Sequence, residues 1–175
     1  IPYVLELLRP MYGLNGAVLA FQLCLLDLML TTLCGNSRKF DENFIMDDDV
    51  FVDAYYLTES EIKTFLTESP YGKKSFLADL ISGGQETSQI IAEAARQYQI
   101  NPLVLLTKLQ VESSLVFQTT APSTFVLDRA MGCGCPDGDP SCQRAPKGLH
   151  AQVMCAARLF RRYLTELDDR NETVS

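Results

Sequence analysis

Hydrophobic positions recur at helical spacing over two long stretches of the chain. Between residues 86 and 99, and again between residues 149 and 164, apolar side chains fall three or four positions apart. This spacing puts them on one face of a helix, so an amphipathic helix is predicted over each stretch. The expected inward-facing residues are Ile90, Ile91, Ala94, Ala95 and Tyr98, followed by Val153, Ala156, Ala157, Phe160 and Leu164. The chain becomes polar from Thr165, and this tail is expected to fray.

Polar residues and glycines predict where shorter elements begin and end. Thr58 and Glu61 have the spacing of a capping box, which predicts a helix over residues 58–68. Residues 73–80 are expected to form another short helix that stops at the glycine pair 83–84. No alternating run is long enough to predict a substantial sheet. The pattern therefore predicts a mainly α fold.

One further helix ends by presenting a carboxylate. Asn101 can cap its start and Pro102 suits its first turn, so an amphipathic helix is predicted over residues 101–114. Its C-terminal end places Glu112 at the edge of an apolar face. The residues expected to share that face are Leu105, Leu109 and Val116. Loss of solvation there should raise the pKa of Glu112, and a general acid needs such a raised pKa. The alternative is that Glu112 is a solvated surface residue, as most glutamates near helix ends are.

The N-terminal forty residues differ from the rest. Residues 16–34 are strongly apolar and about long enough to span a bilayer, but Asp27 interrupts them. We favour a buried helix within an N-terminal segment, residues 1–40, that packs on a main domain over residues 41–175; membrane attachment through residues 16–34 is the alternative. The following acidic trio, Asp47 to Asp49, lacks the ligand spacing of a calcium loop and predicts helix capping or solvation.

Composition narrows the possible functions. The chain has 175 residues, of which 47% are hydrophobic, enough for one domain with a core. Its formal net charge of -7 disfavours a nucleic-acid partner. His150 is the single histidine, so a His-rich metal site or a Ser-His-Asp triad is hard to assemble. We expect a monomer with no metal and no cofactor.

The cysteines indicate disulfides. Residues 119–148 form a long irregular stretch, a kind of loop that is usually functional, and Cys135 and Cys142 flank turn residues within it. With one histidine and no CxxC pair, a disulfide between them is favoured over zinc. Two further bridges are possible, although sequence leaves the connectivity open: Cys24 with Cys34, and Cys133 with Cys155. Disulfides imply a secreted or periplasmic protein.

The order of these elements resembles a known superfamily. The segment NPLVLLTKLQVESS, a loop with Ala-Met-Gly at residues 130–132, and the segment GLHAQVMCAARLFRRY at residues 148–163 are similar to the lysozyme-like superfamily, in particular goose-type lysozymes and soluble lytic transglycosylases. Glu112-Ser113 matches the Glu-Ser pair of that signature, and Ser123 falls where a loop serine is expected. One departure is plain: Cys133-Gly134-Cys135 replaces the Leu-Met-Gln of the transglycosylase turn, so the glutamine that orients substrate is missing.

A nearer resemblance is to bacterial secreted proteins with an MG-GCPD loop. Here that loop is Met131 to Asp137, followed by Cys142, Gln152 and an Ala-rich helix that ends at Tyr163. The likeness covers about residues 44–164. It implies a lysozyme-like helical domain with an extra N-terminal helical segment and a disulfide-bearing substrate loop.

The resemblance implies a glycoside hydrolase that cleaves the glycan backbone of bacterial peptidoglycan. Glu112 would be the general acid, and Asp128 or Asp137 is a candidate second carboxylate. The candidate substrate-binding residues are Ser113, Ser123, Asp128, Met131, Gly132, Asp137 and Gln152. Ser123 and Gln152 could instead satisfy buried backbone groups, and loop aspartates more often stabilise turns. The alternatives are a lytic transglycosylase and a non-catalytic wall-binding module. The acidic chain is expected to favour glycans with free amines, such as deacetylated peptidoglycan.

Overall fold

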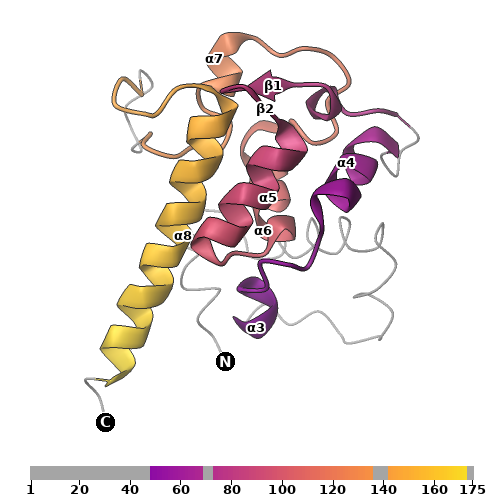
Figure 1. Cartoon of the computed structure of the whole chain (residues 1–175). Coiled ribbons are helices and arrows are strands. Elements are labelled where there is room, and N and C mark those ends of the chain that lie inside the picture. The colour runs from indigo at the N-terminus through magenta and orange to yellow at the C-terminus, as the bar shows by residue number, and fades with distance from the viewer. Residues whose placement is uncertain (1–47, 69–72, 136–141, 173–175) are drawn as a thin grey trace, which may run out of the picture.

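The computed structural model describes residues 48–68, 73–135 and 142–172, and these residues are mainly helical (Figure 1). The predictions for residues 1–40, including the Cys24–Cys34 bridge, and for Asp137 lie outside the described residues. In chain order the described elements are α3 (Asp48–Phe51), α4 (Glu59–Glu68), the 3-10 helix η1 (Phe76–Ala78), β1 (Ile81–Ser82), β2 (Gln85–Glu86), α5 (Thr87–Tyr98), α6 (Pro102–Ser113), α7 (Thr124–Leu127) and α8 (Gly148–Glu172).

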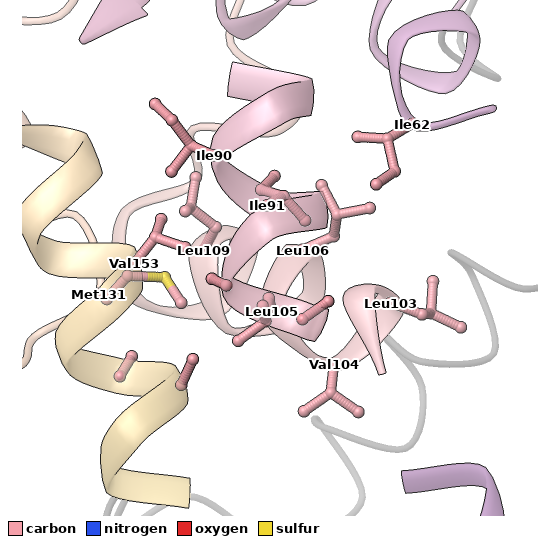
Figure 2. Packing of buried hydrophobic residues seen from close by; sticks show 14 of the residues in the cluster. Ile62, Ile90, Ile91, Leu103, Val104, Leu105, Leu106, Leu109, Met131 and Val153 are labelled. Carbon is pink, nitrogen blue, oxygen red and sulfur yellow. The ribbon is translucent and has the colours of Figure 1, made fainter. Parts of the chain in front are cut away.

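The core is built where α5 packs against α4, α6 and α8. Figure 1 shows α5 between α4 and the long α8, and Figure 2 shows apolar side chains of α5 and α6 meeting in the centre. Ile90, Ile91, Leu105 and Leu109 are each 0% exposed. The inward-facing residues predicted for α5 and α8 are confirmed, with Tyr98 and Leu164 at the partly buried margin.

Helix α6 is buried around its whole circumference. Residues 102–110 are all buried, including Thr107, Lys108 and Gln110. The prediction that this helix is amphipathic was wrong, because neighbouring elements enclose it, and a helix enclosed on every side has no solvent face. Val116 is also buried, but it lies beyond the helix and therefore shares no helical face with Glu112.

Helix starts follow the polar residues that predicted them. Thr58 and Glu61 form the expected capping box: Glu61 Oε2 accepts from Thr58 N at 2.7 Å, and Thr58 Oγ1 accepts from Glu61 N at 3.3 Å. Asn101 caps α6 by accepting from Leu103 N at 2.8 Å. Its amide also donates to Val50 O at 2.8 Å, which ties α6 to α3.

The region predicted as a helix over residues 73–80 is different. It contains only η1, and the chain then forms the two-stranded antiparallel hairpin of β1 and β2. Gly83 and Gly84 are the turn of this hairpin rather than a helix stop, with φ of 60° and 83°. A two-residue hairpin turn of type I′ requires positive φ at both central residues, which glycine tolerates.

Helix α8 is longer than the sequence pattern predicts. It begins at Gly148 and continues to Glu172, so the expected fraying from Thr165 was wrong. Leu167 is 7% exposed, and Arg161 Nε donates to Tyr98 O at 2.7 Å, which fastens α8 to the end of α5. Within the described part of the chain, no helix is both long enough and apolar enough to cross a membrane.

Candidate functional site

Glu112 lies in the last turn of α6, where its carboxylate meets a lysine from the same helix. Lys108 Nζ is 2.9 Å from Glu112 Oε1, as an i,i+4 spacing allows. The Lys108 side chain is only 4% exposed, while that of Glu112 is 23% exposed. The carboxylate is therefore held from inside the core and still reaches solvent.

The other carboxylate oxygen lies against a glycine. Gly132 belongs to the turn that follows α7 and has φ of 64°. A Cβ atom at this position would lie 2.7 Å from Glu112 Oε2, far closer than carbon and oxygen tolerate. The positive φ favours glycine here, and an added Cβ would in addition require the Glu112 side chain to shift.

Ser113 fastens the end of α6 to the same turn. Its Oγ is 2.9 Å from Leu109 O and 2.9 Å from Ala130 O. The contact joins residues that are 17 positions apart. Ser113 was a candidate substrate-binding residue, but its hydroxyl lies within hydrogen-bond distance of both carbonyls and can donate its one proton to either, which gives it a positioning role.

Gln152 holds the turn from the α8 side. Its Oε1 accepts from Met131 N at 3.2 Å and from Cys133 N at 3.1 Å, and its Nε2 donates to Cys133 O at 3.0 Å and Pro146 O at 2.8 Å. The residue is 0% exposed. It cannot touch a substrate, so of the two roles that the sequence allowed, the structure supports satisfaction of buried backbone groups.

Met131 is likewise a core residue. It is 0% exposed and lies beside Val153 and Leu109 in Figure 2. Its prediction as a substrate contact was wrong, because the turn directs the side chain inward, where apolar burial favours it. Of the predicted Ala-Met-Gly motif, Gly132 alone meets the carboxylate in the described contacts.

Two predicted polar residues lie on the approach to the turn. Asp128 Oδ1 accepts from Gly148 N at 2.9 Å, so this aspartate links the end of α7 to the start of α8. Ser123 precedes α7, is exposed, and makes no capping hydrogen bond with its side chain. Ser123 therefore remains a candidate for substrate binding, whereas Asp128 has the turn-stabilising role expected of loop aspartates.

Two disulfides frame this region. Cys135 pairs with Cys142 as predicted, and Cys133 pairs with Cys155, which was one of the possible pairings. The second bridge links the residue after Gly132 to α8. No group of three or more histidine, cysteine, aspartate or glutamate side chains in the described residues could hold a metal ion.

We expect the two bridges to contribute unequally to stability. Their sequence separations are 22 for Cys133–Cys155 and 7 for Cys135–Cys142. In the chain-entropy model, loss of the longer loop costs about 3 kcal/mol and loss of the shorter one about 2 kcal/mol. Urea unfolding of the two double-alanine variants measures both costs, and a larger loss for the Cys135–Cys142 pair would contradict this order.

No family model, no curated protein and no solved structure matches the chain. The lysozyme-like likeness therefore stands on the motifs of the sequence alone. The structure brings two of those motifs together, because Ser113 and Ala130 are hydrogen-bonded and Gly132 abuts Glu112.

Lys108 is the site residue that sequence reasoning missed. The available signal was a lysine four positions before a glutamate in an otherwise apolar stretch. On an exposed helix that spacing is an ordinary surface pair, and nothing in the local sequence showed that this helix is enclosed on all sides.

Proposed function

We propose that the protein is a glycoside hydrolase that cleaves the glycan backbone of bacterial peptidoglycan, with Glu112 as the general acid. The observation that carries the proposal is the fixed position of this carboxylate. Lys108 holds one of its oxygens, and the Gly132 backbone approaches the other. A proton donor held in one place by its surroundings is what general acid catalysis needs.

In the proposed reaction, protonated Glu112 gives its proton to the glycosidic oxygen. The bond between that oxygen and the anomeric carbon breaks, and its electron pair stays with the oxygen. Positive charge develops on the sugar, water adds to the anomeric carbon, and a proton returns to the Glu112 carboxylate. Lys108 stabilises the carboxylate that exists between the two proton transfers, because its ammonium group is 2.9 Å away.

No second carboxylate is assigned to this mechanism. The candidate Asp128 accepts a hydrogen bond from Gly148 N, and Asp137 lies outside the described residues. Cys133-Gly134-Cys135 stands in place of the turn glutamine of lytic transglycosylases, which favours hydrolysis over transglycosylation. Analysis of the released fragments separates the two reactions, because hydrolysis leaves a reducing end and transglycosylation leaves none.

A non-catalytic wall-binding module is the second candidate. The Lys108–Glu112 ion pair favours it, because an i,i+4 pair within one helix is a common structural contact that takes no part in chemistry. Purified cell walls separate the candidates: the enzyme solubilises them, whereas a binding module sediments with them and leaves them intact. Absence of both effects would reject both candidates.

The cysteine pairing is consistent with the proposed location. Two disulfides are present in the described residues, and such bridges persist in oxidising compartments. We therefore propose that the protein is secreted or periplasmic, where peptidoglycan is accessible, and that it acts as a monomer without a nucleic-acid partner.

Deacetylated glycan is expected to be digested at least as fast as fully acetylated peptidoglycan at low salt. Lys108 offsets the local charge of Glu112, so the expectation rests on the formal net charge of -7 of the chain. This negative charge attracts the free ammonium groups of a deacetylated glycan, and salt weakens the attraction by screening it. Matched digests at low and high salt measure the preference. Faster digestion of the acetylated wall at low salt would contradict it without affecting the role of Glu112.

A further inference from the structure

Large hydrophobic side chains are exposed at three positions in the part of the chain that the structure describes: Tyr55 at 73%, Ile81 at 66% and Phe125 at 60%. A single exposed hydrophobic residue is common on protein surfaces, so exposure alone assigns no role. Phe125 differs from the other two in its place along the chain. It lies on α7, which follows the exposed candidate Ser123 and precedes the turn that contains Gly132.

The Phe125 ring has one face covered and the other open. The Arg129 guanidinium carbon lies 3.7 Å from the ring centre, and Arg129 Nη1 donates to Phe125 O at 3.3 Å. A guanidinium group at this distance from the centre covers one face of the ring. Because Phe125 is still 60% exposed, its accessible surface lies on the opposite face and along the ring edge. Phe125 therefore presents a flat apolar surface whose orientation is already set.

This ring lies at the same end of the molecule as the Glu112 carboxylate. Figure 1 shows α7 at the end where α8 starts, and Gly132 N donates to Arg129 O at 2.9 Å in the turn after α7. Helical turns rise about 1.5 to 2.0 Å per residue, so the backbone of Phe125 lies about 10 to 14 Å from that of Gly132. Gly132 in turn lies against the Glu112 carboxylate. Phe125 is thus too remote to contact the bond that Glu112 would act on, but one polysaccharide strand can reach both residues.

We propose that Phe125 is a sugar-binding platform, whose open ring face stacks on a pyranose ring of the glycan strand away from the cleaved bond. The inference rests on the proposed glycosidase function for the identity of the ligand. A pyranose ring carries C–H groups on its faces, and the face of a phenyl ring is the negative side of its quadrupole, so the two flat surfaces attract each other and exclude water. The exposed hydroxyl of Ser123, at the start of the same helix, is a hydrogen-bonding group for the polar edge of the sugar.

Binding of glycan strands that have been freed of their peptides tests the platform directly. The Glu112→Gln background keeps the strands intact while the dissociation constant is measured. Phe125→Ala is expected to weaken binding about tenfold, because it removes both the stacking and the buried apolar area. Phe125→Leu keeps apolar area but has no flat face, so it should also bind more weakly, whereas Phe125→Tyr should stay within about twofold of its parent.

Tyr55→Ala is the matched control, because it removes an aromatic ring that is even more exposed. Tyr55 follows α3, which is tied to the start of α6 by the hydrogen bond from Asn101 Nδ2 to Val50 O at 2.8 Å. Glu112 lies at the other end of α6, whose 12 residues span about 18 Å. Loss of Tyr55 should therefore leave strand binding unchanged, which separates a specific platform from general adhesion of aromatic side chains to the glycan.

The kinetics of strand cleavage give a readout that a merely structural role would not produce. On long strands, Phe125→Ala should raise KM about tenfold and keep kcat within about twofold, because a contact remote from the cleaved bond holds substrate and transition state equally. Oligosaccharides too short to reach from Glu112 to Phe125 should be cleaved by the variant as by the wild type. A general disturbance of the site would instead lower kcat on both substrates.

The outcomes separate the two proposals. Unchanged strand binding by folded Phe125→Ala, or an equal loss in Tyr55→Ala, would overturn the platform and leave the glycosidase proposal in place. If the wild type binds strands through Phe125 but cleaves none of them, the glycosidase proposal fails and the platform stands as a glycan-binding site. The ring-proton NMR signals of Phe125 should also shift when strands are added to Glu112→Gln, and signals that stay in place at saturation would reject the platform without any substitution of the ring.

Discussion

Glu112→Gln should abolish cell-wall digestion and leave the protein folded. The substitution preserves the size of the side chain and removes the transferable proton. General acid catalysis contributes about 10² to 10⁴ in rate, so the remaining activity should lie near the detection limit. The fold should persist because a glutamine oxygen at this position can still accept from Lys108 Nζ, which lies 2.9 Å from the present carboxylate. Release of soluble fragments from purified walls measures the rate, and circular dichroism checks the fold.

The matched control is Glu166→Gln in the exposed part of α8. Glu166 pairs with Arg162 at 3.4 Å in an i,i+4 pair whose side chains are 62% and 55% exposed, so the change should leave both activity and stability almost untouched. Digestion by the Glu112→Gln variant at the wild-type rate would remove Glu112 from the mechanism. Wall binding without digestion by the wild type would instead favour the non-catalytic module.

Elements whose boundaries depend on neighbouring residues could be predicted from sequence. The capping pair Thr58 and Glu61 and the cap at Asn101 act within one helical turn, so the local pattern already contains the physical cause. The Cys135–Cys142 bridge belongs to the same class, since only six residues separate its partners in a sequence of turn formers. Such features need no knowledge of distant packing.

Features that depend on distant contacts could not be predicted. The burial of α6 on every side depends on the elements that surround it, and the extension of α8 past Thr165 is accompanied by the contact of Arg161 with the end of α5. The glycine pair 83–84 is ambiguous in sequence, because glycine both stops helices and makes tight hairpin turns. The structure shows the hairpin.

The residues of the candidate site also fall into two groups, those that the local sequence shows and those that depend on distant contacts. Glu112 was a candidate because a carboxylate at the end of a helix is visible in sequence, and Gly132 was a substrate-binding candidate from the resemblance, but its place beside Glu112 was not predicted. Met131 was predicted as a substrate contact but is buried. Gln152 had two possible roles in the sequence, and the choice between them depends on a turn 19 to 21 residues away. Lys108 was missed because the sequence does not show that this lysine is buried beside Glu112.

Gln152→Leu is expected to lower the free energy of unfolding by about 3 to 5 kcal/mol. The leucine fills a similar volume, but four backbone groups lose their partners: Met131 N, Cys133 N, Cys133 O and Pro146 O. Each buried group left without a hydrogen bond costs about 1 to 3 kcal/mol, and relaxation of the turn recovers part of the sum. Urea unfolding measures the loss, and Gln97→Leu on the exposed face of α5 is the control, with an expected change within about 0.5 kcal/mol.

The same variant should lose activity even where it stays folded. The Cys133–Cys155 bridge still attaches the turn to α8, so the chain remains connected there while Met131 and Cys133 lose their hydrogen bonds to residue 152. Because Gly132 lies next to the Glu112 carboxylate, a turn that shifts would change the surroundings in which that carboxylate acts. Wall digestion by folded Gln152→Leu at the wild-type rate, or a stability loss below about 1 kcal/mol, would show that the bridge alone is sufficient to hold the turn.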